Sequence, residues 1–295
     1  MNKERVLVIG NGMVGHKFVE VLAQHPQNAS FQISVLCEEP RVAYDRVHLS
    51  EYFSGKTAKD LSLVADGFYE DNHVEVLLDE KAVSIDRINK VVTSGSGKEY
   101  RYDKLVLATG SYPFVPPIPG KDRPECLVYR TIEDLEAIKA TAAKSRVGVV
   151  VGGGLLGLEA AKALRDLGLE THVVEFAPRL MAVQIDDGGG KLLRRMIEEL
   201  GVKVHTEKNT QCIEDGSEHA LKMCFADGSV LETDLILFSA GIRPRDELAK
   251  KSELTMGPRG GIVINNYCQT SDSDIFAIGE CALWNNKLFG LVAPG

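Results

Sequence analysis

Residues 6–15 read VLVIGNGMVG, and residues 149–158 read VVVGGGLLGL. In both stretches a continuous run of β-branched and other apolar residues leads into glycines spaced as GxGxxG. Such a run is typical of a parallel strand buried on both faces. The glycines allow a tight turn into a following helix. The two stretches therefore predict two strand–loop–helix units, each within an α/β module built on a parallel sheet.

The similarity between the two halves of the chain extends beyond the glycines. Residues 33–39 (ISVLCEE) and 171–175 (THVVE) are apolar strands that end in an acid. Further along, residues 105–110 (LVLATG) and 235–241 (LILFSAG) are apolar strands that end in small residues. We interpret the chain as two diverged copies of one α/β module.

Shorter signals predict the elements between these strands. Apolar residues at helical spacing predict a helix over residues 155–167, with Gly168 as its C-cap. Turn pairs at 215–216 and 227–228 predict an antiparallel meander between residues 202 and 237. Residues 111–120 (SYPFVPPIPG) contain four prolines, which fix φ and predict a rigid domain crossing.

Composition argues against several classes of protein. The charged fraction is 26% and the hydrophobic fraction 44%, both typical of globular domains. The formal net charge of −8 opposes a phosphate backbone and argues against a nucleic-acid partner. No apolar run approaches the roughly 18 residues of a membrane span, and residues 1–12 lack a secretory pattern. We therefore expect a cytoplasmic protein that binds neither nucleic acid nor membrane.

The cysteines are widely spaced along the chain. They are Cys37, Cys126, Cys212, Cys224, Cys268 and Cys281. None forms a CxxC pair, the spacing typical of a zinc knuckle or a redox-active dithiol. We therefore expect reduced cytoplasmic thiols, no metal site and no thiol that carries electrons.

Each glycine fingerprint has the parts needed to bind a dinucleotide. The first glycine permits the turn, the second lets the backbone approach a pyrophosphate, and the third lets helix and strand pack closely. The glycines are Gly10, Gly12 and Gly15 in the first copy and Gly152, Gly154 and Gly157 in the second. Free N–H groups at the helix start favour phosphates. Glu38 and Glu175, at the ends of the next strands, can accept hydrogen bonds from ribose hydroxyls.

Two fingerprints in one chain imply two dinucleotides. A hydride needs a donor and an acceptor side by side, which indicates a tightly held flavin and a diffusible nicotinamide. Glu175 at the ribose position favours NADH, because a 2′-phosphate would meet like charge there. Arg179, four residues later, leaves NADPH as an alternative.

The whole chain resembles the FAD-dependent pyridine-nucleotide oxidoreductases. The motifs that carry the resemblance are GNGMVG (10–15), YDRVHLS (44–50), ATGSYP (108–113), YRTIEDL (129–135), GGGLLGLE (152–159), SAGIRP (239–244) and SDIFAIGECA (273–282). Residues 37–53 (CEEPRVAYDRVHLSEYF) and 279–295 (GECALWNNKLFGLVAPG) are further similar to the N-terminal part of the large subunits of NAD(P)H-dependent nitrite reductases.

The resemblance implies an α/β fold of two nested Rossmann-like domains, the two-dinucleotide-binding-domain fold, with central parallel sheets and β-meanders. In this family the nicotinamide domain is inserted into the FAD domain. We therefore expect residues 1–115 to form the first part of the FAD-binding domain. Residues 116–245 would form the inserted NAD(P)H-binding domain, and residues 246–295 the return segment of the FAD-binding domain.

The resemblance also implies which residues contact each cofactor. The FAD set is Gly10, Asn11, Gly12, Met13, Val14, Gly15, Glu38, Arg46, Ala82, Ala108, Thr109, Gly110, Arg130 and Glu280. The NAD(P)H set is Gly152, Gly154, Leu155, Leu156, Gly157, Glu159, Glu175 and Gly241. Most relatives have Asp in place of Glu280, so an extra methylene must be accommodated there. No catalytic side chain is expected, because hydride transfer relies on ring stacking and orientation.

Two features depart from the family pattern. The disulfide-reductase branch has a redox cysteine pair after its first βα unit, and nothing in this sequence corresponds to it. Cys37 is therefore interpreted as a buried thiol near the ribose. Relatives that reduce ferredoxins and rubredoxins often have Lys after Leu-Ser, where this chain has Glu51. An inward-pointing acid would lower the reduction potential of the flavin, whereas a solvated one would not.

The resemblance implies the electron-input module of a nitrite reductase in nitrate assimilation. Residues 291–295 (LVAPG) end where the family begins a further helix, so we expect a longer, multi-domain subunit. Its C-terminal part would hold the iron–sulfur cluster and the sirohaem that reduce nitrite to ammonia, and a small subunit would be a partner. The alternatives are a free-standing NADH-dependent rubredoxin or ferredoxin reductase and a non-catalytic nucleotide-binding module.

Overall fold

The computed structural model describes residues 3–288, which form two compact units. Unit 1 comprises the described residues of Met1–Val47, Lys59–Tyr112 and Arg243–Gly295, and unit 2 comprises His48–Ala58 and Pro113–Ile242. The chain leaves unit 1 inside the proline-rich stretch, in β8 (Ser111–Pro113), and returns in β17 (Ile242–Pro244). The helix expected after residues 291–295 lies outside the described residues.

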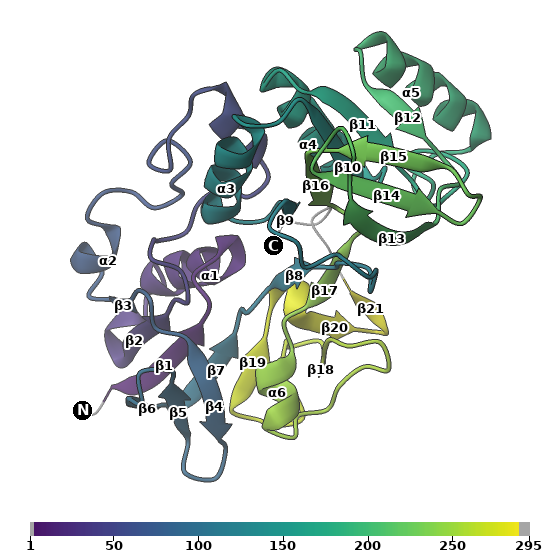
Figure 1. The fold of residues 1–295 in the computed structure, drawn as a ribbon. Helices are drawn as coiled ribbons and strands as arrows, with labels where there is room; N and C mark the ends of the chain where they lie inside the picture. Colours follow the sequence, from purple (N-terminus) through teal and green to yellow (C-terminus); the bar gives the residue numbers. More distant parts are fainter. Residues whose placement is uncertain (1–2, 289–295) are drawn as a thin grey trace. The chain divides into compact units, whose positions relative to one another are not determined.

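A five-stranded parallel sheet forms the centre of unit 1, in the order β19-β7-β1-β2-β3 (Figure 1). Its strands are β1 (Glu4–Ile9), β2 (Phe31–Leu36), β3 (Glu75–Leu77), β7 (Lys104–Leu107) and β19 (Ile275–Ala277). The central strand β1 buries side chains on both faces. Val6 and Val8 pack with Val19 of α1 (Met13–Ala23), whereas Leu7 and Ile9 pack on the opposite face.

An antiparallel meander covers that opposite face of the unit 1 sheet. Its strands are β4 (Ala82–Asp86), β5 (Val91–Ser94) and β6 (Glu99–Arg101). Ile85 and Val92 of the meander share a core with Leu7 and Ile9 of β1. The remaining elements of unit 1 are η1 (Asn28–Ser30), α2 (Phe68–Asp71), α6 (Glu247–Lys251), β18 (Ile262–Ile264), η3 (Gly279–Cys281), β20 (Ala282–Trp284) and β21 (Lys287–Leu288).

Unit 2 repeats the sheet of unit 1, in the order β12-β11-β10-β16-β9. Its parallel strands are β9 (Cys126–Val128), β10 (Val147–Val151), β11 (Glu170–Val174), β12 (Lys203–His205) and β16 (Leu235–Phe238). Its meander consists of β13 (Thr210–Asp215), β14 (Leu221–Phe225) and β15 (Val230–Thr233). Its helices are η2 (Leu49–Ser54), α3 (Ile132–Ala142), α4 (Leu155–Asp166) and α5 (Asp187–Glu199).

This arrangement confirms the predicted α/β fold with parallel sheets and meanders. The predicted helix over residues 155–167 is α4, and Gly168 follows it with φ +89°. The predicted meander over residues 202–237 is wrong at both ends. At its start, β12 pairs in parallel with β11 and buries Val204 at the edge of the main sheet, and at its end β16 pairs in parallel with β10. The segment His48–Ala58 lies in unit 2, although we expected it within residues 1–115, the first part of the FAD-binding domain.

An aspartate anchors the central strand of each sheet. Asp103, just before β7, accepts hydrogen bonds from the backbone N–H of Arg5 (2.8 Å) and from its guanidinium. Asp234, just before β16, accepts from the N–H groups of Arg146 (2.7 Å) and Val147 (3.1 Å). The two copies of the topology therefore share a polar contact, which the comparison of the two halves of the sequence did not identify.

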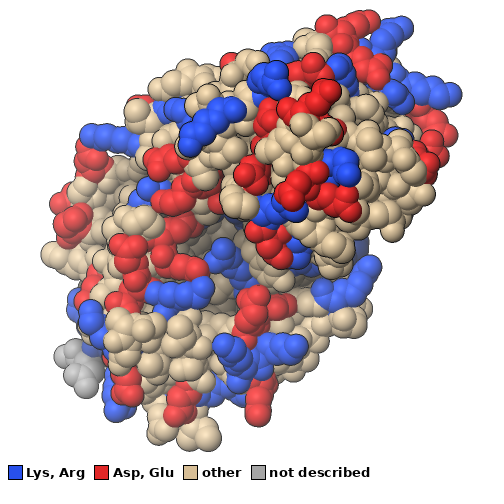
Figure 2. Space-filling model, viewed as in Figure 1, with Lys and Arg blue, Asp and Glu red and all other residues tan. Residues whose placement is uncertain are grey.

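None of the helices within residues 3–288 has the length and apolar character needed to span a membrane. Figure 2 shows acidic and basic side chains interspersed over the face drawn, with no continuous basic surface on that face. This distribution agrees with the acidic net charge of −8.

Candidate functional site

Most of the predicted FAD-site residues follow the carboxyl ends of four strands in unit 1. Residues 10–15 follow β1, Glu38 follows β2, residues 108–110 follow β7, and Glu280 follows β19. Because the strands are parallel, these ends lie at one edge of the sheet, where open α/β sheets bind ligands. The structure thus brings residues from distant parts of the sequence together at the glycine loop.

Close backbone packing explains two of the three glycines in the first loop. Gly10 has φ +108°, and a Cβ there would collide with the carbonyl oxygen of Ala108. A Cβ at Gly15 would collide with the carbonyl oxygen of Gly10, so the third glycine brings helix α1 onto the loop. At Gly12, in contrast, an added Cβ would have no described atom within 4 Å. Protein packing therefore does not explain Gly12, whereas a ligand approaching the backbone does.

The second loop has the same geometry at the carboxyl edge of the unit 2 sheet. Gly152 has φ +121°, and a Cβ there would collide with the carbonyl oxygen of Ser239. A Cβ at Gly157 would collide with the carbonyl oxygen of Gly152. A Cβ at Gly154 would meet no atom of the described residues within 4 Å. Each loop therefore leaves open space at its second glycine, the position at which this motif allows a pyrophosphate to approach the backbone.

The helices that follow the two loops begin without side-chain caps. Gly12 and Gly154 are the N-caps of α1 and α4; within the described residues no side chain caps either helix, and neither first turn has an acid. The start of α3 differs, because Thr131 Oγ1 accepts from the Asp134 N–H (3.2 Å). The exposed N–H groups and dipole of α1 and α4 are therefore available to an anionic ligand.

The two predicted ribose-binding acids have different partners. Glu38 forms ion pairs with Lys81 and Arg245, each at 2.7 Å. Burial raises the pKa of Glu38, but the two cations lower it by more than burial raises it. The pKa of Glu38 therefore lies below its usual value. Glu175 accepts hydrogen bonds from the backbone N–H groups of Gly153 (2.5 Å) and Ala177 (2.6 Å), one at each carboxylate oxygen. Each oxygen of Glu175 retains a lone pair for a ribose hydroxyl.

A buried polar network lies behind the first glycine loop. The Tyr69 hydroxyl donates to Asn11 Oδ1 (2.9 Å) and lies 3.0 Å from His16 Nδ1. Burial raises the pKa of Tyr69 to about 12 and lowers that of His16, so both groups are neutral near pH 7. Asn11 Nδ2 is buried and has no hydrogen-bond partner among the described residues. Sequence reasoning missed Tyr69 and His16, because neither belongs to the glycine motif.

The return segment joins the first site through several short contacts. The Ser111 hydroxyl donates to Glu280 Oε2 (2.6 Å), and the Thr109 hydroxyl donates to the Arg245 carbonyl (2.6 Å). A Cβ at Gly279 would lie 3.1 Å from Val14 Cγ2, so the residue before Glu280 packs against the first turn of α1. Lys81 and Arg245, the partners of Glu38, were not predicted from the sequence.

Two other predicted FAD contacts lie in different surroundings in unit 1. Arg46 forms an ion pair with Glu39, and its guanidinium lies over the Tyr44 ring at 4.7 Å from the centroid. Ala82 is the first residue of β4 and pairs with Ser94 of β5. Arg46 is therefore fixed in orientation by a carboxylate and an aromatic face.

In unit 2 the predicted residues also follow strand ends. Gly241, with φ +106°, follows β16, and its carbonyl accepts from the Phe114 N–H (2.8 Å). Arg130, predicted to contact FAD, is buried in unit 2 and follows β9.

The other predicted NAD(P)H contacts lie on helix α4. Burial raises the pKa of Glu159 on this helix, and the charge of His48 partly offsets this effect. Leu155 and Leu156 form the first turn of α4.

The structure shows the surroundings of Cys37 and Glu51, the two residues at which the departures from the family pattern were considered. Cys37 is buried, its thiol donates to the Arg41 carbonyl (3.4 Å), and burial raises its pKa. A buried thiol with a raised pKa is a poor nucleophile. Glu51 forms an ion pair with Lys56, so its charge is locally compensated.

A family model of pyridine nucleotide-disulphide oxidoreductases matches residues 4–293. The chain belongs to this family. It is 61% identical over 296 residues to the nitrite reductase (NADH) large subunit of Escherichia coli K12, covering 100% of this chain and 35% of that protein. It is 32% identical over 287 residues to a rubredoxin-NAD(+) reductase of Pseudomonas putida, and this match covers 97% of this chain and 74% of that protein.

A crystal structure of a ferredoxin reductase from Rhodopseudomonas palustris is similar, with a TM-score of 0.88 and 30% identity, covering 96% of this chain and 69% of that one. The chain spans about a third of the length of the nitrite reductase subunits it matches.

Members of this family bind FAD and NAD(P)H, and the residues present fit such groups. Open space at Gly12 and Gly154 faces the uncapped helix starts. The buried Asn11 amide has a donor that no described residue uses. A buried unpaired donor costs free energy, so a bound acceptor near the first loop would remove this cost.

Proposed function

We propose that unit 1 binds FAD and that unit 2 binds NAD(P)H, with NADH preferred. The observation that carries this proposal is the duplicated glycine cradle, in which Gly12 and Gly154 face open space at uncapped helix starts. Family membership supports the pairing of a flavin with a nicotinamide. When bound, FAD would supply the acceptance of a hydride and the release of electrons one at a time.

In unit 1 the protein would bind and orient the flavin dinucleotide. The N–H groups of residues 10–15 would donate to the pyrophosphate. Glu38 would accept from the adenosine ribose, while Lys81 and Arg245 hold its carboxylate in place. Glu280, oriented by Ser111, would accept from the ribityl chain.

In unit 2 the protein would select and orient the nicotinamide dinucleotide. Glu175 accepts hydrogen bonds from the N–H groups of Gly153 and Ala177, so its carboxylate lies against the glycine loop that would bind the pyrophosphate. A 2′-phosphate there would meet a negative charge. The Arg179 guanidinium donates instead to the carbonyls of Ile185 (3.1 Å) and Ala182 (3.2 Å) and to Asp187. These contacts support NADH as the preferred donor.

We further propose that the chain is the electron-input module of a nitrite reductase. The chain is 61% identical to the E. coli nitrite reductase large subunit but only 32% identical to the rubredoxin reductase, which supports this assignment. Electrons would then pass to iron–sulfur and sirohaem centres in other parts of the protein, with a small subunit as a partner. The second candidate is a free-standing rubredoxin or ferredoxin reductase. It is favoured by length, because the chain covers 74% of the Pseudomonas putida rubredoxin-NAD(+) reductase.

A cytoplasmic location is part of this proposal. The six cysteines form no disulfide within the described residues, as is usual where thiols are kept reduced. NADH as the electron donor is consistent with the same compartment.

Anaerobic stopped-flow mixing of the flavin-loaded protein with NADH tests the central proposal. We expect the flavin absorbance to bleach in a single turnover, and more efficiently with NADH than with NADPH. A protein that retains oxidised flavin in saturating NADH would be a nucleotide-binding module, and the proposal would be wrong. Nitrite-dependent oxidation of NADH by the whole protein, compared with reduction of rubredoxin, then separates the two enzymatic candidates.

A further inference from the structure

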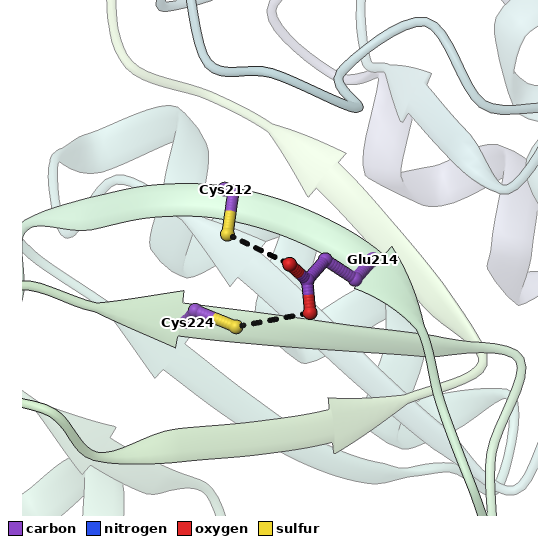
Figure 3. A group of neighbouring side chains, drawn as sticks. All are labelled: Cys212, Glu214 and Cys224. Atoms are coloured by element: carbon purple, nitrogen blue, oxygen red, sulfur yellow. Dashed lines mark hydrogen bonds between the residues drawn. The ribbon is translucent and has the colours of Figure 1, made fainter.

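The meander of unit 2 has a second cluster of reactive side chains, separate from the glycine loop. Cys212 and Glu214 lie on β13, and Cys224 lies on β14 (Figure 3). In the antiparallel register, Cys212 is directly opposite Cys224. Their separation of 12 residues gave no sign of a site in the sequence, because only the hairpin register brings the two thiols together.

The cluster lies on the solvent face of the meander. The intervening residues Ile213 and Met223 point to the opposite face and are buried in the core of unit 2. Since side chains alternate along a strand, Cys212, Glu214 and Cys224 share the outer face. Both cysteines are partly exposed, and Glu214 is 54% exposed. A small ion could therefore reach all three side chains from solvent.

The three donor atoms already converge. Figure 3 shows the Glu214 carboxylate facing both sulfurs, with Cys212 Sγ 3.7 Å from Oε1 and Cys224 Sγ 3.8 Å from Oε2. All three ligand atoms lie within 4.8 Å of one another. Tetrahedral zinc has Zn–S distances of about 2.3 Å and Zn–O distances of about 2.0–2.2 Å, which require donors at this mutual spacing.

We propose that Cys212, Cys224 and Glu214 bind one Zn²⁺ ion, with water as the fourth ligand. Two sulfurs with one carboxylate suit zinc, whereas a site for Cu(I) would favour sulfur alone and a site for Mg²⁺ oxygen alone. Binding would replace the two thiol protons, which leave to solvent, and would form two Zn–S bonds and one Zn–O bond.

The surrounding charge fits such a complex. Two thiolates and a carboxylate around Zn²⁺ leave a net charge of −1. The ammonium of Lys222, 3.0 Å from Glu214 Oε2, compensates this charge. The ion would join β13 to β14 at the outer face, opposite the buried contact of Ile213 with Met223. We therefore expect it to stabilise the meander without taking part in hydride transfer.

Zinc titration of the reduced, metal-free protein against a chromophoric chelator tests the site. We expect one tightly bound Zn²⁺ per chain, lost in Cys212→Ser and Cys224→Ser and weakened in Glu214→Gln. Cys126→Ser is the matched control, because Cys126 is a partly buried thiol of unit 2 outside the cluster. Circular dichroism without metal establishes that each variant folds.

Cobalt and thermal unfolding provide independent readouts. Co²⁺ should give thiolate-to-metal charge-transfer absorption in the wild type and in Cys126→Ser but not in Cys212→Ser. Zinc should raise the melting temperature of the wild type and leave that of Cys224→Ser unchanged. The proposal is wrong if zinc binds equally to the two cluster cysteine variants, or if the reduced wild type binds no stoichiometric zinc. Mass spectrometry that finds a Cys212–Cys224 disulfide in the metal-free protein purified anaerobically would also overturn it.

Discussion

Glu38 in unit 1 and Glu175 in unit 2 follow equivalent strands of the same topology, but they are held differently. Glu175 accepts N–H groups from its own loop region, at Gly153 and Ala177. Glu38 forms ion pairs with Lys81 and with Arg245 of the return segment. Unit 1 is assembled from three separate stretches of chain. Its acid therefore joins segments that are distant in sequence, while the acid of unit 2 shapes a local loop.

The difference shows that an acid at the same place in one topology can be held by different partners. The glycines are almost interchangeable between the copies, since Gly10 and Gly152 have similar positive φ values and analogous backbone contacts. The two acids, Glu38 and Glu175, are not interchangeable, because their immediate partners differ. Variants at the packed glycines Gly15 and Gly157 should consequently have matched effects on stability, whereas variants at the two acids should have unmatched effects.

The largest effect is expected from Gly15→Ala and Gly157→Ala. Each new Cβ would collide with a backbone carbonyl, of Gly10 or of Gly152, which no rotamer change can relieve. Overpacking usually costs about 1–3 kcal/mol and sometimes more, and a clash with rigid backbone places both variants at or above the upper end of that range. We expect a comparable loss in the free energy of unfolding for both variants, measured by urea denaturation. A large loss in one variant and none in the other would show that the two loops are not equivalent.

An intermediate effect is expected from Glu175→Ala on the choice of donor. Hydrogen bonds to a charged group contribute about 1.5–3 kcal/mol, so the preference for NADH over NADPH should narrow by roughly 10- to 100-fold at 1.4 kcal/mol per decade. The ratio of kcat/KM for the two donors measures this change. Glu175→Gln, which retains an acceptor oxygen, is the control and should have an intermediate ratio. Equal efficiency with both donors in the unmutated protein would contradict the role of Glu175.

The sequence predicted the parts of the molecule that depend on local pattern. The glycine loops, the central strands and the helix over residues 155–167 follow from periodicity and spacing alone. The edge strand β12 did not, because three residues carry too little pattern to distinguish a parallel edge from a meander. Side-chain partners such as Lys81 with Glu38, or Cys212 with Cys224, depend on register and on chain segments that meet only in the fold.

The smallest effect is expected at the aspartate that anchors β1. Hydrogen bonds from the Arg5 side chain and backbone lower the pKa of Asp103 to about 2. The folded-state pKa is thus below the unfolded value of about 3.9, so the contact stabilises the protein above about pH 4, and this contribution is lost as the pH falls toward about 2. Both side chains are more than a third exposed, so we expect less than about 1 kcal/mol.

Urea denaturation of Asp103→Asn and of the wild type across this pH range measures the contribution of Asp103. The difference in the free energy of unfolding should be present near neutral pH and should vanish in acid. A difference that grows as the pH falls would have the wrong sign and would exclude the Arg5 contact as its cause.

The separate assignment of the two loops is tested most directly by Gly12→Ala and Gly154→Ala, with bound flavin and NADH affinity measured in each. Because a Cβ at either position meets no described atom within 4 Å, both variants should fold with unchanged stability. Gly12→Ala should lose flavin, whereas Gly154→Ala should retain it and bind NADH at least about tenfold more weakly, a loss of about 1.4 kcal/mol. Loss of flavin from Gly154→Ala, or full flavin in Gly12→Ala, would contradict the account.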